Sequence, residues 1–90
     1  MRRLSQTTIW KFPFSISDTV KVLMPSDAVV LKIDSQGGVP TIWAAVSEDA
    51  KEVEHTFLLR GTGHPLGCVG PHIASFFHGP FVWHVFEVYK

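Results

Sequence analysis

Three glycines in seven residues distinguish the segment Gly61-Thr62-Gly63-His64-Pro65-Leu66-Gly67, called the 61–67 loop below. Glycine lets the backbone approach a ligand closely and turn N–H groups toward an anion. Arg60 precedes the loop and could form a charge-assisted hydrogen bond to a phosphate, while His64 could stack on or hydrogen-bond to a base. The pattern predicts a ligand-binding loop that comprises Arg60, Gly61, Thr62, Gly63 and His64. A tight turn between two strands is the alternative interpretation.

The glycine spacing separates this loop from the established phosphate-binding motifs. It is G-x-G-x-x-x-G, whereas the dinucleotide fingerprint is G-x-G-x-x-G, and no Lys-Ser/Thr pair follows as in a P-loop. Pro65 and the lack of a helical pattern after it remove the helix N-terminus that both motifs need. The loop therefore does not by itself indicate a dinucleotide-binding or P-loop fold.

Histidines could supply acid–base chemistry, because imidazole titrates near neutral pH. The five are His55, His64, His72, His78 and His84, and none belongs to an H-x-H or H-E-x-x-H pair. We therefore expect no metal ion and no cofactor. His72, His78 and His84 could converge across adjacent strands or could be unrelated. We assign no residue a catalytic role. If His64 acted as a general acid or base, the protein could instead be a small phosphodiester hydrolase, which we keep as an alternative.

Two further residue types could take part in chemistry. The single cysteine, Cys68, cannot form a disulfide within the chain, and its place beside Val69 favours an inert buried thiol over an activated nucleophile. Of Trp10, Trp43 and Trp83, at least two are expected to fill the core. Trp43 is predicted to stack on a ligand ring.

The elements that would position these residues are strands. Apolar and polar residues alternate with a period of two along much of the chain, and no window keeps a helical period. Strands are predicted at residues 10–16, 20–24, 28–34, 39–46, 53–60, 73–77 and 81–89. Six or seven short strands with turn residues between them are typical of an all-β fold, a small antiparallel β-sandwich or barrel-like domain. At most one helical turn is expected, at residues 47–52, where a solvated loop is the alternative.

Several positions within these strands can be predicted from residue type. Pro13 makes the first strand an edge strand or a bulge, and Gly37-Gly38 predicts a tight hairpin turn. The side chains of Val29, Leu31, Ile33 and Phe57 are expected to face the core. The last strand is apolar on both parities, so it is either covered on both faces or lies in a subunit interface.

Composition limits the class of protein. The chain has 90 residues, 46% of them hydrophobic and 12% aromatic, and eight basic residues balance eight acidic ones. This length predicts one domain over residues 1–90, with residues 1–7 as a flexible N-terminus. Zero net charge argues against nucleic-acid binding, and no apolar run approaches the roughly 18 residues that span a bilayer. A neutral, aromatic-rich chain could hide part of its surface in a homo-oligomer.

Short motifs in a fixed order resemble a known family. They are Trp10-Lys11-Phe12, Gly38-Val39-Pro40-x-x-Trp43-Ala44, Gly61-Thr62-Gly63-His64-Pro65 and His84-Val85-Phe86-Glu87. Together they look like a family of small proteins from tailed bacteriophages and prophages, whose function is unknown. The resemblance spans residues 8 to 87, and it implies a setting in the cytoplasm of an infected bacterium rather than a defined activity.

These observations lead to a functional expectation. We expect a non-enzymatic phage accessory protein, of a counter-defence type, that captures a host protein or a small nucleotide-like ligand. A structural or assembly role in the virion is the alternative, since a compact neutral β-domain suits it equally well. The phosphodiester hydrolase comes last, because one histidine without an identified partner does not make a mechanism.

Overall fold

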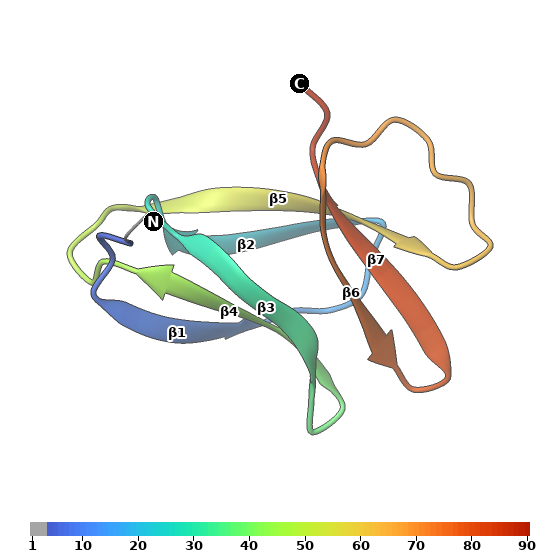
Figure 1. Cartoon of the computed structure of the whole chain (residues 1–90), viewed down its shortest axis with the longest axis horizontal. Coiled ribbons are helices and arrows are strands. Elements are labelled where there is room, and N and C mark those ends of the chain that lie inside the picture. The colour runs from blue at the N-terminus through green and yellow to red at the C-terminus, as the bar shows by residue number, and fades with distance from the viewer. Residues whose placement is uncertain (1–3) are drawn as a thin grey trace.

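The computed structural model describes residues 4–90, which form seven β-strands and no helix (Figure 1). The strands are β1 (Thr8–Pro13), β2 (Thr19–Pro25), β3 (Val29–Gln36), β4 (Val39–Val46), β5 (Glu52–Gly61), β6 (His72–His78) and β7 (Phe81–Glu87). All pairings are antiparallel, in a three-stranded sheet of order β1-β4-β3 and a four-stranded sheet of order β2-β5-β7-β6. The predicted all-β sandwich is confirmed, and residues 47–51 connect β4 to β5 through a turn without a helix.

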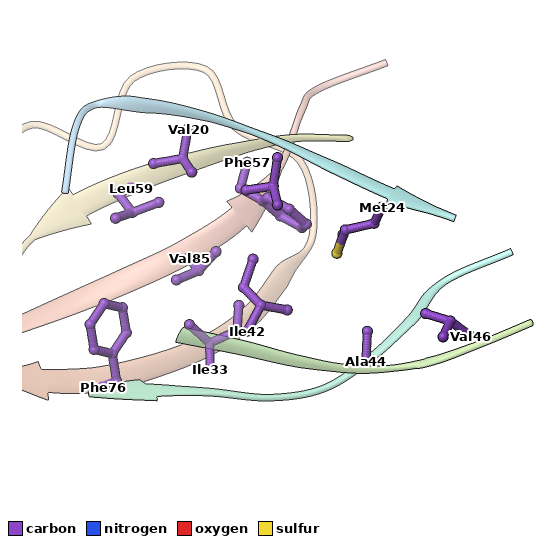
Figure 2. Packing of buried hydrophobic residues seen from close by; sticks show 11 residues of the cluster. Val20, Met24, Ile33, Ile42, Ala44, Val46, Phe57, Leu59, Phe76 and Val85 are labelled. Atoms are coloured by element: carbon purple, nitrogen blue, oxygen red, sulfur yellow. The ribbon is translucent and has the colours of Figure 1, made fainter. Parts of the chain in front are cut away.

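The core lies between the two sheets, where alternate side chains of each strand point inward (Figure 2). Met24 and Leu59 of the four-stranded sheet and Val46 of the three-stranded sheet are fully buried. Phe57 is 6% exposed, as its strand parity predicts. Trp10 and Trp83 pack against this cluster, whereas Trp43 does not, so two of the three tryptophans support the core. Complete burial of each large apolar side chain contributes about 1.5–3 kcal/mol.

The first strand follows its predicted pattern. Trp10 and Phe12 are half-buried while Lys11 and Pro13 are exposed. β1 forms an edge of the three-stranded sheet, which a proline can occupy because the outer side of an edge strand needs no backbone donor.

The predicted inward positions in β3 are partly wrong. Ile33 is buried, but Val29 and Leu31 are exposed and Val30 faces the core instead. The pairing of β3 with β4 shifts register between Val30 and Lys32, so Leu31 is an extra residue that has no cross-strand partner. Such a bulge breaks the period of two, and strict alternation therefore assigns the wrong face to residues before it.

The turn between β3 and β4 is the predicted glycine hairpin. Gly37 and Gly38 have φ angles of +57° and +82°. Positive φ at both central residues suits a type I′ turn, whose twist matches that of the flanking strands.

Two hydrogen bonds join the sheets where β3 lies beside β6. The Ser35 hydroxyl donates to the Phe77 carbonyl at 2.8 Å, and Ser35 Oγ lies 3.2 Å from His78 Nδ1. β7 is a central strand, paired with β5 on one side and with β6 on the other. Val85 is buried on its inner face, whereas Val82 and Phe86 on its outer face are only half-buried. β7 ends at Glu87, so Val88 and Tyr89 extend beyond it as exposed side chains.

Hydrogen bonds also hold the segment that precedes β1. Residues 1–3 of the expected flexible N-terminus lie outside the described residues. Of the rest, the Thr7 amide donates to the Val46 carbonyl at 3.0 Å and the Gln6 side chain donates to the Asp27 carbonyl at 2.6 Å. The Asp27 carboxylate in turn accepts a hydrogen bond from the Ser47 amide at 3.1 Å.

The core assignment predicts the effect of truncating Phe57. Phe57→Ala should lower the free energy of unfolding by about 3–5 kcal/mol in urea titrations, because it removes buried contacts and leaves a cavity. Phe77→Ala is the matched control: Phe77 is 67% exposed, so its loss should be below about 1 kcal/mol. Equal losses for the two variants would contradict the assignment of Phe57 to the core.

The environment of Asp27 predicts that the stability of the fold depends on pH. Hydrogen bonds from the Ser47 side chain and backbone lower the pKa of Asp27 below its ordinary value. The native state therefore favours the charged form of Asp27, and the ionised carboxylate stabilises the fold. This stabilisation is fully present above about pH 4 and is lost as the pH falls through the lower native pKa. Asp27→Asn should weaken the dependence of the melting temperature on pH below pH 4, and an unchanged acid profile would refute the role of this contact.

Candidate functional site

The 61–67 loop begins where β5 ends, opposite Trp83 of β7. Gly61 is the last residue of β5 to pair with β7, and the Thr62 amide still donates to the Val82 carbonyl at 3.1 Å. The His64 amide donates to the Gly61 carbonyl at 3.0 Å, which closes a tight turn, and Gly63 has a φ of +92°. In Figure 1 the chain from here to β6 runs outside the sheets as a long loop.

A pocket of about 490 Å³ lies beside this turn. Its lining residues are Gly61, Thr62, His64, Pro80, Phe81, Val82 and Trp83. None of them carries a carboxylate, an ammonium or a guanidinium group, and three of them present aromatic rings. The volume is typical of a small-ligand site, and the wall chemistry suits a flat or apolar group rather than an anion.

His64 and Gly61 depend on each other. The His64 ring meets the Trp83 ring edge to face, with centroids 5.9 Å apart and an interplanar angle of 73°. A Cβ atom at Gly61 would lie 2.9 Å from two atoms of the His64 ring, so only glycine leaves room for this arrangement. His64 therefore serves as a wall of the pocket, and no hydroxyl or carboxylate hydrogen-bonds to its ring among residues 4–90.

Arg60 holds the loop and does not line this pocket. Its Nε donates to the Leu66 carbonyl at 2.8 Å, and its Nη1 donates to the Leu59 and Asp18 carbonyls at 2.9 and 3.3 Å. Three of the five guanidinium N–H donors thus bind backbone oxygens, and Nη2 keeps the remaining two. Arg60 lines a neighbouring hollow with Asp18, Thr19, His64 and Pro65. His64 separates the two hollows.

Trp43 lies elsewhere in the molecule. It belongs to β4 of the other sheet, where its cross-strand partners are Lys11 and Lys32, and the Lys32 ammonium is 5.8 Å from its ring centroid. Of the six predicted binding residues, the structure brings Gly61, Thr62 and His64 into the pocket. The pocket residues that sequence analysis missed come from the start of β7 and its turn, where Pro80-Phe81-Val82-Trp83 forms a dense apolar run.

The sequence leaves open whether His72, His78 and His84 converge, and the structure links two of them. His72 Nε2 lies 2.9 Å from Ser75 Oγ, which lies 2.7 Å from His84 Nδ1. His84 Nε2 is 2.8 Å from Thr62 Oγ1, so two imidazoles and two hydroxyls form one continuous row, called the polar row below. His78 instead contacts Ser35. The polar row begins at Thr62, which also lines the pocket.

The prediction of a buried thiol at Cys68 is wrong. Cys68 is exposed, because the segment between β5 and β6 lies outside both sheets and its side chains from Thr62 to Cys68 face solvent. Residues 4–90 contain no group of three or more His, Cys, Asp or Glu side chains that could hold a metal ion. No helix of the described chain is long and apolar enough to cross a membrane.

The fold and the pocket define the protein as a small two-sheet β-sandwich with an apolar hollow at the end of its four-stranded sheet. The chain belongs to a family described as a domain of unknown function (DUF7352), whose model matches residues 5–90. No curated protein and no solved structure matches the chain.

The close approach of Gly61 to His64 predicts an energetic coupling. Gly61 does not have a positive φ, so Gly61→Ala strains the site through the His64 ring rather than through the backbone. Gly61→Ala should therefore destabilise the wild type more than the His64→Ala variant, by at least about 0.5 kcal/mol in a urea double-mutant cycle. Equal costs in the two backgrounds would show that the His64 ring does not occupy this position in solution.

Proposed function

We propose that this protein is a non-enzymatic binding module of a tailed phage or prophage that captures a host protein in the cytoplasm of the infected bacterium. The observation that carries the proposal is the apolar pocket beside the 61–67 loop. The phage setting rests on the resemblance of its motifs, and a counter-defence role suits that setting.

The surface around the pocket favours a protein as the ligand. Phe81 lines the pocket and is 64% exposed, and the rings of His64 and Trp83 form further parts of its wall. A solvent-exposed phenylalanine at an uncharged, aromatic hollow resembles the centre of a protein interface, which is rich in aromatic and poor in charged side chains. We infer that an apolar side chain of the host protein enters the pocket while Phe81 contacts the surface around that side chain.

A nucleotide-like small molecule is the second candidate. The rings of His64 and Trp83 and the Thr62 hydroxyl could hold a base, and the hollow on the other side of His64 contains Arg60. The hydrogen bonds of Arg60 to backbone carbonyls leave only Nη2 for a phosphate, so this geometry supports the protein ligand more strongly.

Quantitative capture from bacterial lysate tests the proposal. A host protein retained by the wild type should be depleted at least tenfold by Phe81→Ser, because losing a central aromatic contact costs about 2 kcal/mol or more. Leu23→Ser is the matched control: Leu23 is equally exposed but lies on β2 opposite Glu54, far along β5 from Gly61, and its variant should retain the same protein. Identical retained sets for all three chains would refute capture at the pocket.

Two companion measurements separate the alternatives. Thermal unfolding is followed with a panel of cyclic and linear signalling nucleotides, since a ligand at a hundred times its Kd adds about 2.7 kcal/mol. If a nucleotide raises the melting temperature and the His64→Ala substitution abolishes this shift, the ligand of the pocket is a nucleotide and not a host protein. Light scattering over a range of concentrations tests self-association. A dimer that the Phe81→Ser substitution abolishes would show that the pocket surface binds a second copy of the chain.

A further inference from the structure

The polar row is a second site, distinct in chemistry from the pocket. It crosses three neighbouring strands of the four-stranded sheet: Thr62 follows β5, His84 is on β7, and Ser75 and His72 are on β6. Ser75 is paired with His84 in the β6–β7 register, and both lie on the outer face of the sheet, since the neighbouring Phe76 and Val85 point into the core.

The distances in the row fit two arrangements of protons, and the tautomer of His84 distinguishes them. In the arrangement that activates Ser75, Thr62 Oγ1 donates to the Val82 carbonyl at 3.4 Å and its lone pair accepts a proton from His84 Nε2 at 2.8 Å. His84 Nδ1 then carries the free lone pair and accepts the hydroxyl proton of Ser75 at 2.7 Å. In this tautomer His84 is a base aimed at a hydroxyl, and Thr62 orients it as the third member of a catalytic triad does.

We propose that Ser75 is a nucleophilic hydroxyl that accepts an acyl group from a small uncharged ester, with His84 as its general base. Ser75 Oγ attacks the ester carbonyl while His84 Nδ1 takes the hydroxyl proton. The bond from the carbonyl carbon to the leaving oxygen then breaks, and that oxygen receives the proton from His84. The products are the O-acyl serine and the free alcohol, so no oxidant, reductant or co-reactant is required.

His72 is the residue that we expect to stabilise the carbonyl oxygen in this step. Its Nε2 lies 2.9 Å from Ser75 Oγ, and in the arrangement described above it donates its proton to that oxygen. As Ser75 attacks, we expect this N–H to turn to the carbonyl oxygen of the ester, where negative charge develops. The His72 ring is held edge to face against Phe86, with centroids 5.3 Å apart and an interplanar angle of 64°. Ser75, His72 and Thr62 are exposed, so an ester can reach the row without rearrangement of the sheet.

The charge around the row favours acyl over phosphoryl transfer. Transfer of a phosphoryl group needs cations that neutralise its oxygens. Within residues 4–90 the guanidinium group belongs to Arg60, the cross-strand partner of His84, and the hydrogen bonds of its Nε and Nη1 run to the carbonyls of Leu66, Leu59 and Asp18 rather than toward Ser75. The row itself consists of hydroxyls and imidazoles, which suits an uncharged carbonyl.

Acylation of the full chain by p-nitrophenyl acetate tests the proposal. Release of p-nitrophenol and peptide mass spectrometry should locate one fast-forming acetyl group on Ser75, and Ser75→Ala should abolish that adduct. His84→Gln should slow its formation at least tenfold, in keeping with the usual contribution of a general base. Ser15→Ala is the matched control, because Ser15 is an exposed serine between β1 and β2, and it should leave the rate unchanged.

Further variants separate activation from a structural effect. Ser75→Cys should restore an adduct that still depends on His84, because a thiol is also a nucleophile that the imidazole can deprotonate. Thr62→Val should slow acylation, and Thr62→Ser, which keeps the hydroxyl, should restore it. Acetyl groups confined to lysines, equal labelling of Ser15 and Ser75, or an unchanged rate in His84→Gln with native circular dichroism would each overturn the proposal.

Discussion

The antiparallel pairing of β5 with β7 is the constraint on which the core, the pocket and the polar row all depend. It runs from Phe57 opposite Glu87 to Gly61 opposite Trp83. On the inner face it places Leu59 beside Val85, and both are almost completely buried. On the outer face it places Arg60 beside His84. A register slip of one residue would move the whole apolar set to the solvent side, so burial of the inner face also specifies the outer one.

The same pairing explains why the pocket lies at one end of the four-stranded sheet and why the polar row begins there, at Thr62. β7 begins at Phe81, two residues before the partner of Gly61, so its first residues extend past the end of β5. The 61–67 loop turns away there, and the space beside it becomes the pocket. Thr62 stands at the junction, where its hydroxyl meets His84 while its main chain still follows Val82.

The two proposed activities would use different physical properties of this end. The pocket offers apolar and aromatic surface that gains free energy when it is removed from water, which suits capture of a partner. The polar row offers a hydroxyl aligned with a base, which suits a covalent step. The two sites share Thr62, which lines the pocket and contacts His84 of the polar row.

Much of the fold could be predicted from the sequence because its evidence is local. Residue patterns predict all seven strands, alternation predicts the half-buried face of β1 and the burial of Phe57 in β5, and Gly37-Gly38 predicts the hairpin from the conformational freedom of glycine alone. The errors have the same origin. Leu31 was assigned to the core because nothing in its neighbours signals a bulge, and Cys68 was assigned a buried place because its apolar neighbour cannot reveal a loop outside both sheets.

In the candidate site, too, some features can be predicted from local sequence and others depend on how distant strands pack. The order of residues alone shows that a glycine-rich loop follows a strand at residues 61–67 and that Pro80 to Trp83 form an apolar run. Only the packing of the strands shows that these two segments share a pocket, that Trp43 lies on the other sheet and that Arg60 hydrogen-bonds to the loop. Likewise, His72 and His84 meet through Ser75 because β6 and β7 pair in one register. Side-chain neighbours across a sheet depend on the register between distant strands, which is set by the burial of the whole inner face.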